Sequence, residues 1–161
     1  HGRTRCDMYK GEAEYDTIQR TREAIQIPLI ANGDITSTAK AREVLSTTGV
    51  DAVMIGRGTQ GDPWLPGIIA AELDGRALSR PRVEVQIATM AELIREIQVF
   101  YGENTGVKMA RKHMQWFLKR FANGAEAWSQ LQSIVDPDVQ YQQFKELIDG
   151  GGLRDGIERT G

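Results

Sequence analysis

The sequence has few of the residues that build disulfide bridges and metal sites: one cysteine, Cys6, and two histidines, His1 and His113, among 161 residues. A single cysteine excludes a disulfide framework within the chain and is typical of a reducing compartment. Two distant histidines and one cysteine do not have the spacing of zinc ligands, so we expect no metal site. A lone thiol without a local base is inert in most proteins, and Cys6 is not assigned a catalytic role.

Long hydrophobic runs are also missing. No apolar stretch approaches the roughly 18 residues of a membrane helix, and we expect no membrane segment. The chain opens with the residues HGRTR and not with an initiator methionine or a signal peptide, so we expect a part of a longer protein. Hydrophobic residues make up 40% of the chain, which is enough for a packed core, and the net charge of −2 indicates no class of partner.

The first half of the chain is organised around two short apolar runs, residues 27–31 and 51–55, which each end in a glycine-containing polar turn. Continuous apolar runs of this length are typical of parallel strands buried on both faces. Periodic apolar residues and capping residues around them predict helices over residues 12–26, 36–48 and 67–73. The β-α-β order predicts parallel α/β layers.

The second half of the chain has no strand signal. Apolar stripes at helical spacing predict four helices, over residues 83–101, 106–121, 125–135 and 137–149, and the short loops between them favour an antiparallel bundle. We therefore expect an α/β domain over residues 1–78 and a helical domain over residues 79–149. Residues 150–161 are rich in glycine and charge, which predicts a flexible tail.

The two polar turns suggest an anion site. Asn32, Gly33 and Asp34 follow the first predicted strand, and Gly56 and Arg57 follow the second. Backbone amides beside helix starts bind phosphate, and an arginine binds it bidentately. The same residues are also typical of a tight turn stabilised by Asx side chains. The charge of Asp34 opposes an anion, unless its carboxylate contacts a hydroxyl or a ring edge of the ligand.

The predicted helix over residues 106–121 is strongly basic. It has no acidic residue and carries five cationic ones, Lys108, Arg111, Lys112, Lys119 and Arg120. A concentrated basic face suits a nucleic-acid backbone. The alternative is a solvated face whose lysines and arginines form salt bridges with the acidic residues of the preceding helix, Glu84, Glu92 and Glu96.

Five short motifs, taken together and in order, resemble the bacterial tRNA-dihydrouridine synthases, and most closely their NifR3-like branch. They are HGRTR at residues 1–5, YKG at 9–11, IANGDI at 30–35, IGRG at 55–58 with Gly61 and Pro63-Trp64 after it, and ARKHMQWF at 110–117. The resemblance implies a cytoplasmic enzyme with a (β/α)8 TIM barrel that holds FMN, followed by a helical domain that grips tRNA. It also implies that NADPH reduces the flavin, which then passes a hydride to a uridine.

The resemblance also implies roles for individual residues. Those that bind the cofactor are His1, near the isoalloxazine ring, and the phosphate-binding Asn32, Gly33, Asp34, Gly56 and Arg57. Those that bind RNA are Arg3, Lys108, Arg111 and Lys112.

The chain departs from this family in what precedes His1. The first five strands of the barrel and the catalytic cysteine are absent, so we expect no catalytic residue in this chain. We expect it to be inactive without the missing N-terminal barrel half. Two alternatives remain: a non-catalytic RNA-binding helical module, and a part of another FMN barrel oxidoreductase, such as a relative of dihydroorotate dehydrogenase.

Overall fold

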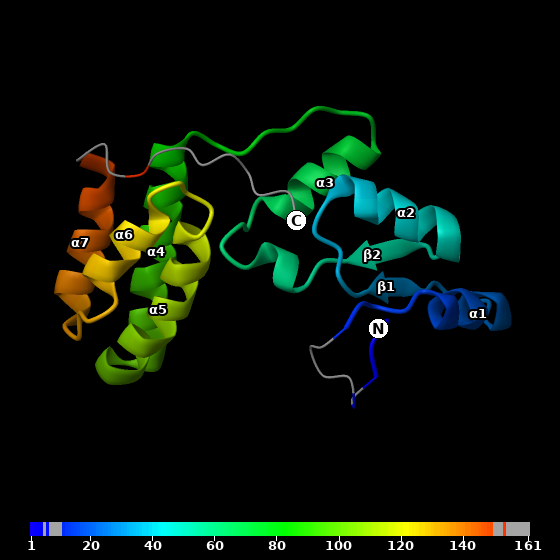
Figure 1. Cartoon of the computed structure of the whole chain (residues 1–161), viewed down its shortest axis with the longest axis horizontal. Coiled ribbons are helices and arrows are strands. Elements are labelled where there is room, and N and C mark those ends of the chain that lie inside the picture. Colours follow the sequence, from blue (N-terminus) through cyan, green and yellow to red (C-terminus); the bar gives the residue numbers. More distant parts are fainter. Residues whose placement is uncertain (5, 7–10, 150–152, 154–161) are drawn as a thin grey trace. The chain divides into compact units, whose positions relative to one another are not determined.

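The computed structural model describes the chain except for residues 5, 7–10, 150–152 and 154–161 (Figure 1). The chain divides into two compact units, His1–Ser79 and Arg80–Gly161, here called the α/β unit and the helical unit. The predicted flexible tail lies outside the described residues, apart from Leu153. No helix in the described ranges is both long and apolar enough to cross a membrane.

A parallel pair of strands, β1 (Ile30–Asn32) and β2 (Ala52–Met54), forms the centre of the α/β unit (Figure 1). In their register, Ile30 is opposite Ala52 and Asn32 is opposite Met54. Both strands are shorter than the apolar runs that predicted them. At the start of each run, the Leu29 N–H donates to the Asp51 carboxylate at 2.8 Å, and the Asp51 N–H donates to the Leu29 carbonyl at 3.0 Å. The Asp51 side chain therefore takes the place of a backbone acceptor between the two strands at Leu29.

Three helices complete the α/β unit: α1 (Asp16–Ala24), α2 (Thr38–Thr48) and α3 (Leu65–Leu73). The predicted caps of α2 are confirmed. Ser37 Oγ accepts from the Lys40 N–H at 3.2 Å, and Gly49, at φ 65°, donates its N–H to the Leu45 carbonyl at 3.1 Å. The helices share one core with the sheet, formed by Ile18, Ala31, Ile35, Ala41, Val44, Val50, Leu65 and Ile69.

The prediction that both strands are buried on both faces is wrong for this chain. Ala31 lies in the core, but Ile30 and Met54 remain 59% and 55% exposed. Successive side chains of a strand point to opposite faces of the sheet. Within the described part of the chain, only the face that carries Ala31 is covered, so the other face stays open.

The helical unit contains α4 (Val83–Tyr101), α5 (Glu103–Leu118), α6 (Gly124–Leu131) and α7 (Pro137–Asp149) (Figure 1). Its largest buried side chains come from the predicted stripes: Ile87, Met90, Ile94, Met114, Phe117, Leu118, Leu131 and Phe144. Asp136 accepts from the Val139 N–H at 2.9 Å, as expected for the residue that precedes Pro137 at a helix start.

The basic helix differs from its predicted bounds. It begins three residues early, so that Glu103 lies in its first turn, and it ends at Leu118. Lys119 and Arg120 therefore lie beyond the helix. Tyr101 belongs to the apolar stripe that predicted α4, yet it is exposed at the end of that helix.

Three glutamines, Gln86, Gln98 and Gln140, are buried in the helical unit, although their polarity predicts exposure. Gln98 Nε2 donates to Gln140 Oε1 at 2.9 Å and to the Pro137 carbonyl at 3.0 Å. Gln140 Nε2 donates to the Val107 carbonyl at 3.3 Å. These bonds tie α4, α5 and α7 together through the core, because buried amides are stable where they are hydrogen-bonded.

Candidate functional site

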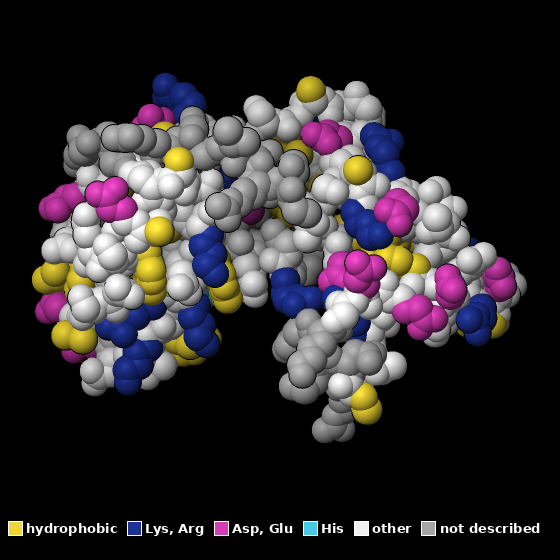
Figure 2. Space-filling view, in the orientation of Figure 1, with side chains coloured by type: hydrophobic (Ala, Val, Ile, Leu, Met, Phe, Trp, Pro, Cys, Tyr) yellow, Lys and Arg dark blue, Asp and Glu magenta, His cyan; other side chains and the backbone are white. Residues whose placement is uncertain are grey.

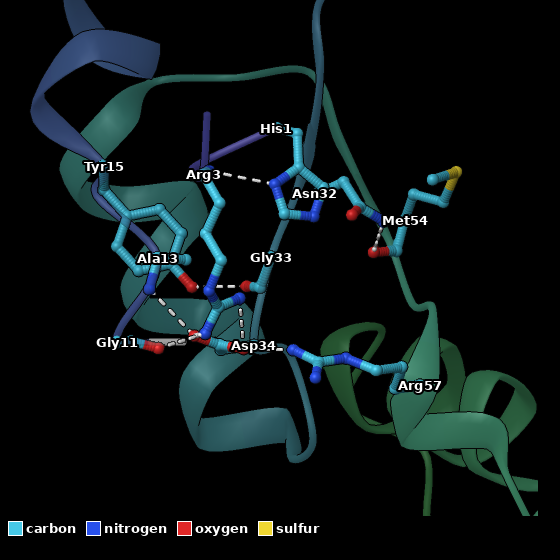
Figure 3. Close-up of polar contacts among 10 residues, drawn as sticks. All are labelled: His1, Arg3, Gly11, Ala13, Tyr15, Asn32, Gly33, Asp34, Met54 and Arg57. Atoms are coloured by element: carbon cyan, nitrogen blue, oxygen red, sulfur yellow. Dashed lines mark hydrogen bonds and ion pairs between the residues drawn. The ribbon is translucent and has the colours of Figure 1, made fainter. Parts of the chain in front are cut away.

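The carboxyl ends of β1 and β2 meet at one edge of the sheet, and the predicted cofactor residues gather there (Figure 3). Asn32 ends β1, and its Nδ2 donates to the Met54 carbonyl on β2 at 3.0 Å. The Asn32 carbonyl accepts from the Gly2 N–H at 2.9 Å. Asn32 therefore cross-links the two strand ends and fixes the N-terminal segment beside β1.

Gly33 is required for close packing of this N-terminal segment. Its φ is 139°, a conformation that favours glycine, and a Cβ there would lie only 2.7 Å from the Cβ of Ala13. The Tyr15 hydroxyl donates to the Gly33 carbonyl at 2.6 Å. Burial raises the pKa of Tyr15, which keeps that hydroxyl a donor. The contacts of Gly33 thus serve the fold of the loop.

Asp34 lies at the centre of the polar network (Figure 3). Its carboxylate accepts from Arg3 Nη1 at 2.7 Å and Arg3 Nη2 at 2.5 Å, from the Ala13 N–H at 2.8 Å, and from Arg57 Nη2 at 3.3 Å. The hydrogen bond from Arg3 lowers the pKa of Asp34 from its ordinary value, aided by the Ala13 N–H and by the charge of Arg57 and opposed by burial. Asp34 is therefore an anion at neutral pH.

The loop after β2 offers an exposed cation next to open space. Arg57 begins the short 3₁₀-helix η1 (Arg57–Thr59), and its side chain is 48% exposed. A Cβ on Gly56 would meet only Asn32 Nδ2, at 3.8 Å, so a ligand can approach the backbone there. Two guanidinium groups contact the single carboxylate of Asp34, and the formal charges of these three side chains sum to +1. The two arginines therefore offset the negative charge of Asp34 at this edge.

His1 lies at the same edge, where its exposed ring accepts the Arg3 N–H at Nδ1 at 2.9 Å (Figure 3). Figure 3 shows His1 together with Asn32, Gly33, Asp34 and Arg57, and Gly56 lies next to the Asn32 side chain, so the six predicted cofactor residues gather at this edge. No pattern in the sequence had indicated Ala13 or Tyr15, which shape the loop through a backbone amide and a hydroxyl.

Arg3 does not lie where the tRNA-binding prediction requires. Its side chain is only 5% exposed, and its guanidinium binds Asp34 and the Gly11 carbonyl. A buried, bidentate arginine of this kind has no guanidinium edge to offer an RNA backbone. We therefore withdraw Arg3 from the RNA-binding set. No local pattern predicts the pair of Arg3 and Asp34, because its members are 31 positions apart.

The basic face of α5 is exposed at Lys108 and Lys112, and Figure 2 shows lysine and arginine side chains gathered on one part of the helical unit. Neither lysine forms an ion pair with any acidic side chain that the structure describes. Arg111 is different, because its Nη2 donates to the Ile134 carbonyl at 2.7 Å and its buried Nε has no described hydrogen-bond partner. Arg111 thus tethers α5 to the segment after α6.

His113 lies beside this face, with its ring 5.2 Å from that of Trp116 in an edge-to-face contact. Burial lowers the pKa of His113, and the neighbouring charge of Lys112 lowers it further. The imidazole is therefore neutral at physiological pH and adds no charge to the face. Among the described residues, no three histidine, cysteine, aspartate or glutamate side chains gather as a metal site.

Comparison with known proteins supplies the family. The family model described as dihydrouridine synthase (Dus) matches residues 1–149. The chain is similar to tRNA-dihydrouridine synthase B of Pseudomonas aeruginosa, at 46% identity over 154 residues, which is 92% of this chain and 45% of that protein. It is 45% identical to tRNA-dihydrouridine synthase B of Proteus vulgaris over 151 residues, which is 92% of this chain and 46% of that protein.

A third relative is the probable tRNA-dihydrouridine synthase of Rickettsia conorii, which is 43% identical over 148 residues, 91% of this chain and 45% of that protein. The chain thus spans about half the length of the relatives it matches. The matched region includes both strand-end loops and the basic helix. The chain belongs to the dihydrouridine synthase family.

Proposed function

We propose that this chain is part of a flavin-dependent tRNA-dihydrouridine synthase, which reduces specific uridines in tRNA to 5,6-dihydrouridine with FMN and NADPH. The names of its relatives support this function. The observation that carries the proposal is the exposed Arg57 beside the unobstructed Gly56, at the carboxyl end of a parallel strand. Ligands of α/β barrels bind at that end of the strands.

The α/β unit corresponds, in this proposal, to the last strands of a (β/α)8 barrel in the cytoplasm. The open sheet face with Ile30 and Met54 then packs against the missing N-terminal half. That half also supplies the catalytic residue, since none is assigned here. The chain alone is inactive, because two strands cannot close a barrel.

The residues present fit the phosphate end of FMN. The Arg57 guanidinium binds the phosphate, and Gly56 leaves room for it. Asn32, Gly33 and Asp34 hold the adjoining loop in shape, and His1 would contact the isoalloxazine ring. Bound FMN supplies the hydride that reduces the uracil ring.

The helical unit is the tRNA-binding part of the proposal. Lys108 and Lys112 contact the phosphate backbone, since both are exposed and form no ion pair with a described residue. Arg111, tethered to the Ile134 carbonyl, supports the face more than it contacts RNA. Each phosphate contact contributes about 0.9 to the slope of log affinity against log salt concentration.

The proposed activity is tested with a fusion protein in which the N-terminal half of the Pseudomonas aeruginosa relative precedes this chain. We expect the joined protein to retain a flavin absorption band after desalting and to form dihydrouridine in unmodified tRNA when NADPH is supplied. Arg57→Ala should lose the flavin band, whereas Arg76→Ala, at an exposed arginine paired with Asp74, should keep it. A folded, flavin-loaded protein that forms no dihydrouridine would refute the proposed activity.

The test of the RNA face is the double variant Lys108→Ala/Lys112→Ala. We expect it to reduce the salt slope of tRNA binding by about 1.8, because two phosphate contacts are lost. The control is Lys40→Ala/Lys145→Ala, which removes the same charge elsewhere, where Lys40 pairs with Glu43 and Lys145 lies over Tyr141. Equal slopes for the two double variants would contradict this face.

A further inference from the structure

Two arginines contact Asp34 in different ways. Arg3 holds both carboxylate oxygens, at 2.7 and 2.5 Å, from a side chain that is almost fully buried. Arg57 contacts a single oxygen, at 3.3 Å, from a side chain that is half exposed (Figure 3). One arginine is thus an internal partner of the carboxylate, and the other contacts the carboxylate from the surface.

The backbone around Arg3 fixes its position. The Gly2 N–H is bound to the Asn32 carbonyl, and the Arg3 N–H donates to His1 Nδ1. At its other end, Arg3 Nη2 also donates to the Gly11 carbonyl at 2.5 Å. With anchors at the backbone and at the guanidinium, Arg3 cannot turn outward to a ligand without breaking several hydrogen bonds.

An aspartate so close to an anion site needs a counter-charge. Without a counter-charge, the carboxylate repels a phosphate. It also forms a tight ion pair with the nearest exposed guanidinium, which is then less able to bind the phosphate. A bidentate arginine pair is the strongest compensation that a side chain offers. The buried Arg3 provides that compensation from the side of Asp34 facing Gly11 and Ala13.

We propose that Arg3 is a positioning residue for the cofactor phosphate: it neutralises Asp34 from within, so that Asp34 orients Arg57 without capturing it. This inference rests on the proposed function, which assigns the phosphate of FMN to Arg57. It gives Arg3 a role at the flavin site in place of the RNA contact that the family resemblance implied. Arg3 acts through Asp34 and touches no ligand itself.

The charges of four variants follow directly from this arrangement. The trio of Arg3, Asp34 and Arg57 carries one net positive charge. Arg3→Gln removes it and leaves the carboxylate facing Arg57 alone. Asp34→Asn added to Arg3→Gln restores the single positive charge, now on Arg57. Asp34→Asn alone leaves two positive charges, and Arg57→Gln removes the ligand-facing one.

The measurement is the ratio of riboflavin to FMN dissociation constants, taken for the full chain by flavin fluorescence. The ratio isolates the phosphate, because losses of ring binding or of folded protein affect both flavins alike. We expect the unaltered chain to prefer FMN, and Arg57→Gln to abolish the preference. Arg3→Gln should lower the ratio by about tenfold, as one uncompensated but solvent-screened charge predicts. The double variant Arg3→Gln/Asp34→Asn should recover most of it.

The exposed pair of Arg76 and Asp74, at 3.1 Å, provides matched controls, since Arg76→Gln and Asp74→Asn make the same charge changes away from the site. Neither should change the ratio. An unchanged ratio in Arg3→Gln, with the preference still lost in Arg57→Gln, would overturn the inference and leave the proposed function intact. Failure of the double variant to recover would also overturn it, since Arg3 would then act other than through Asp34.

A second readout covers the case in which Arg3→Gln fails to fold. In the unaltered chain, arginine side-chain NMR signals are followed while inorganic phosphate is added. The Arg57 guanidinium signals should shift and those of Arg3 should not. A direct phosphate shift at Arg3 would refute the positioning role. A further outcome is that the unaltered chain binds riboflavin and FMN with equal dissociation constants while the joined enzyme still forms dihydrouridine. In that case Arg57 does not bind the phosphate, and this inference fails. The proposed activity would stand.

Discussion

Gly106 lies where α5 crosses α4, and replacing it by alanine tests the packing of the helical unit. A Cβ at this position would lie 2.5 Å from Gln98 Cα, 3.0 Å from the Gln98 carbonyl oxygen and 3.1 Å from the Ile97 carbonyl oxygen. All three are backbone atoms, so no side chain can rotate away. The two helices must separate until the first contact reaches at least 3.4 Å, the shortest ordinary contact of a Cβ.

Two effects of opposite sign compete in Gly106→Ala. Helix propensity favours alanine over glycine by up to about 1 kcal/mol. Overpacking of a close helix crossing costs about 1–3 kcal/mol, and a rigid neighbour places the cost near the upper end. We expect a net loss of about 2 kcal/mol in the free energy of unfolding of the helical unit. Propensity alone predicts a gain, so the sign of the change decides between the two arguments.

The assay is native-state hydrogen exchange of the α4 and α5 amides, which reports the opening free energy of this unit separately from the α/β unit. The control is Gly67→Ala in α3, where an added Cβ meets only Leu78 Cδ2, at 3.9 Å. That variant should stabilise the α/β unit by up to about 1 kcal/mol. Slower exchange, or no change, in Gly106→Ala would refute the packing argument.

Three further predictions concern side chains whose environments the structure defines. Because the pKa of Asp34 is lowered in the folded state, its carboxylate stabilises the fold above the ordinary pKa of about 3.9. This stabilisation is lost as pH falls through the lower pKa of the folded state. The difference in melting temperature between Asp34→Asn and the unaltered chain should therefore be largest near pH 7 and vanish in strong acid. Gln140→Ala should lower the free energy of unfolding of the helical unit by about 2–4 kcal/mol in urea denaturation, because a fully buried, hydrogen-bonded amide is removed. The control Gln142→Ala, at an exposed glutamine, should lower it by less than about 0.5 kcal/mol. Equal losses in the two variants would contradict the buried network. Phe117→Ala should cost about 3–5 kcal/mol in the same assay, and Phe100→Ala, at a ring that is 81% exposed, should cost almost nothing.

Much of the fold could be predicted from the sequence, because its signals are local. The apolar stripe of α4 predicted the helix Val83–Tyr101, and Gly49 predicted the end of α2 at Thr48, although α2 begins two residues after its predicted start. The side chains and backbone conformations behind these signals act within one or two turns of their own positions. The sequence also predicted that the glycine-containing turns after β1 and β2 lie close together, since β-α-β connectivity places the carboxyl ends of parallel strands at one edge of the sheet.

The errors arose where distant segments meet. The strands were predicted to be buried on both faces from their apolar composition, but burial depends on which segments pack against them, and Ile30 and Met54 remain more than half exposed. No local pattern predicts the burial of Gln98 and Gln140, because each has the other as a hydrogen-bond partner 42 positions away.

The sequence by itself therefore determined the presence and order of the helices, the C-terminal cap of α2, the two strand-end turns and the family to which the chain belongs. Only the tertiary structure decided which arginine is exposed at the strand-end loops. The sequence does not distinguish Arg3 from Arg57, since both are arginines in polar, glycine-containing segments. In the structure, Arg3 is buried against Asp34, whereas Arg57 is half exposed beside Gly56. The difference depends on long-range packing, because a backbone hydrogen bond between Gly2 and Asn32 places Arg3 inside the loop.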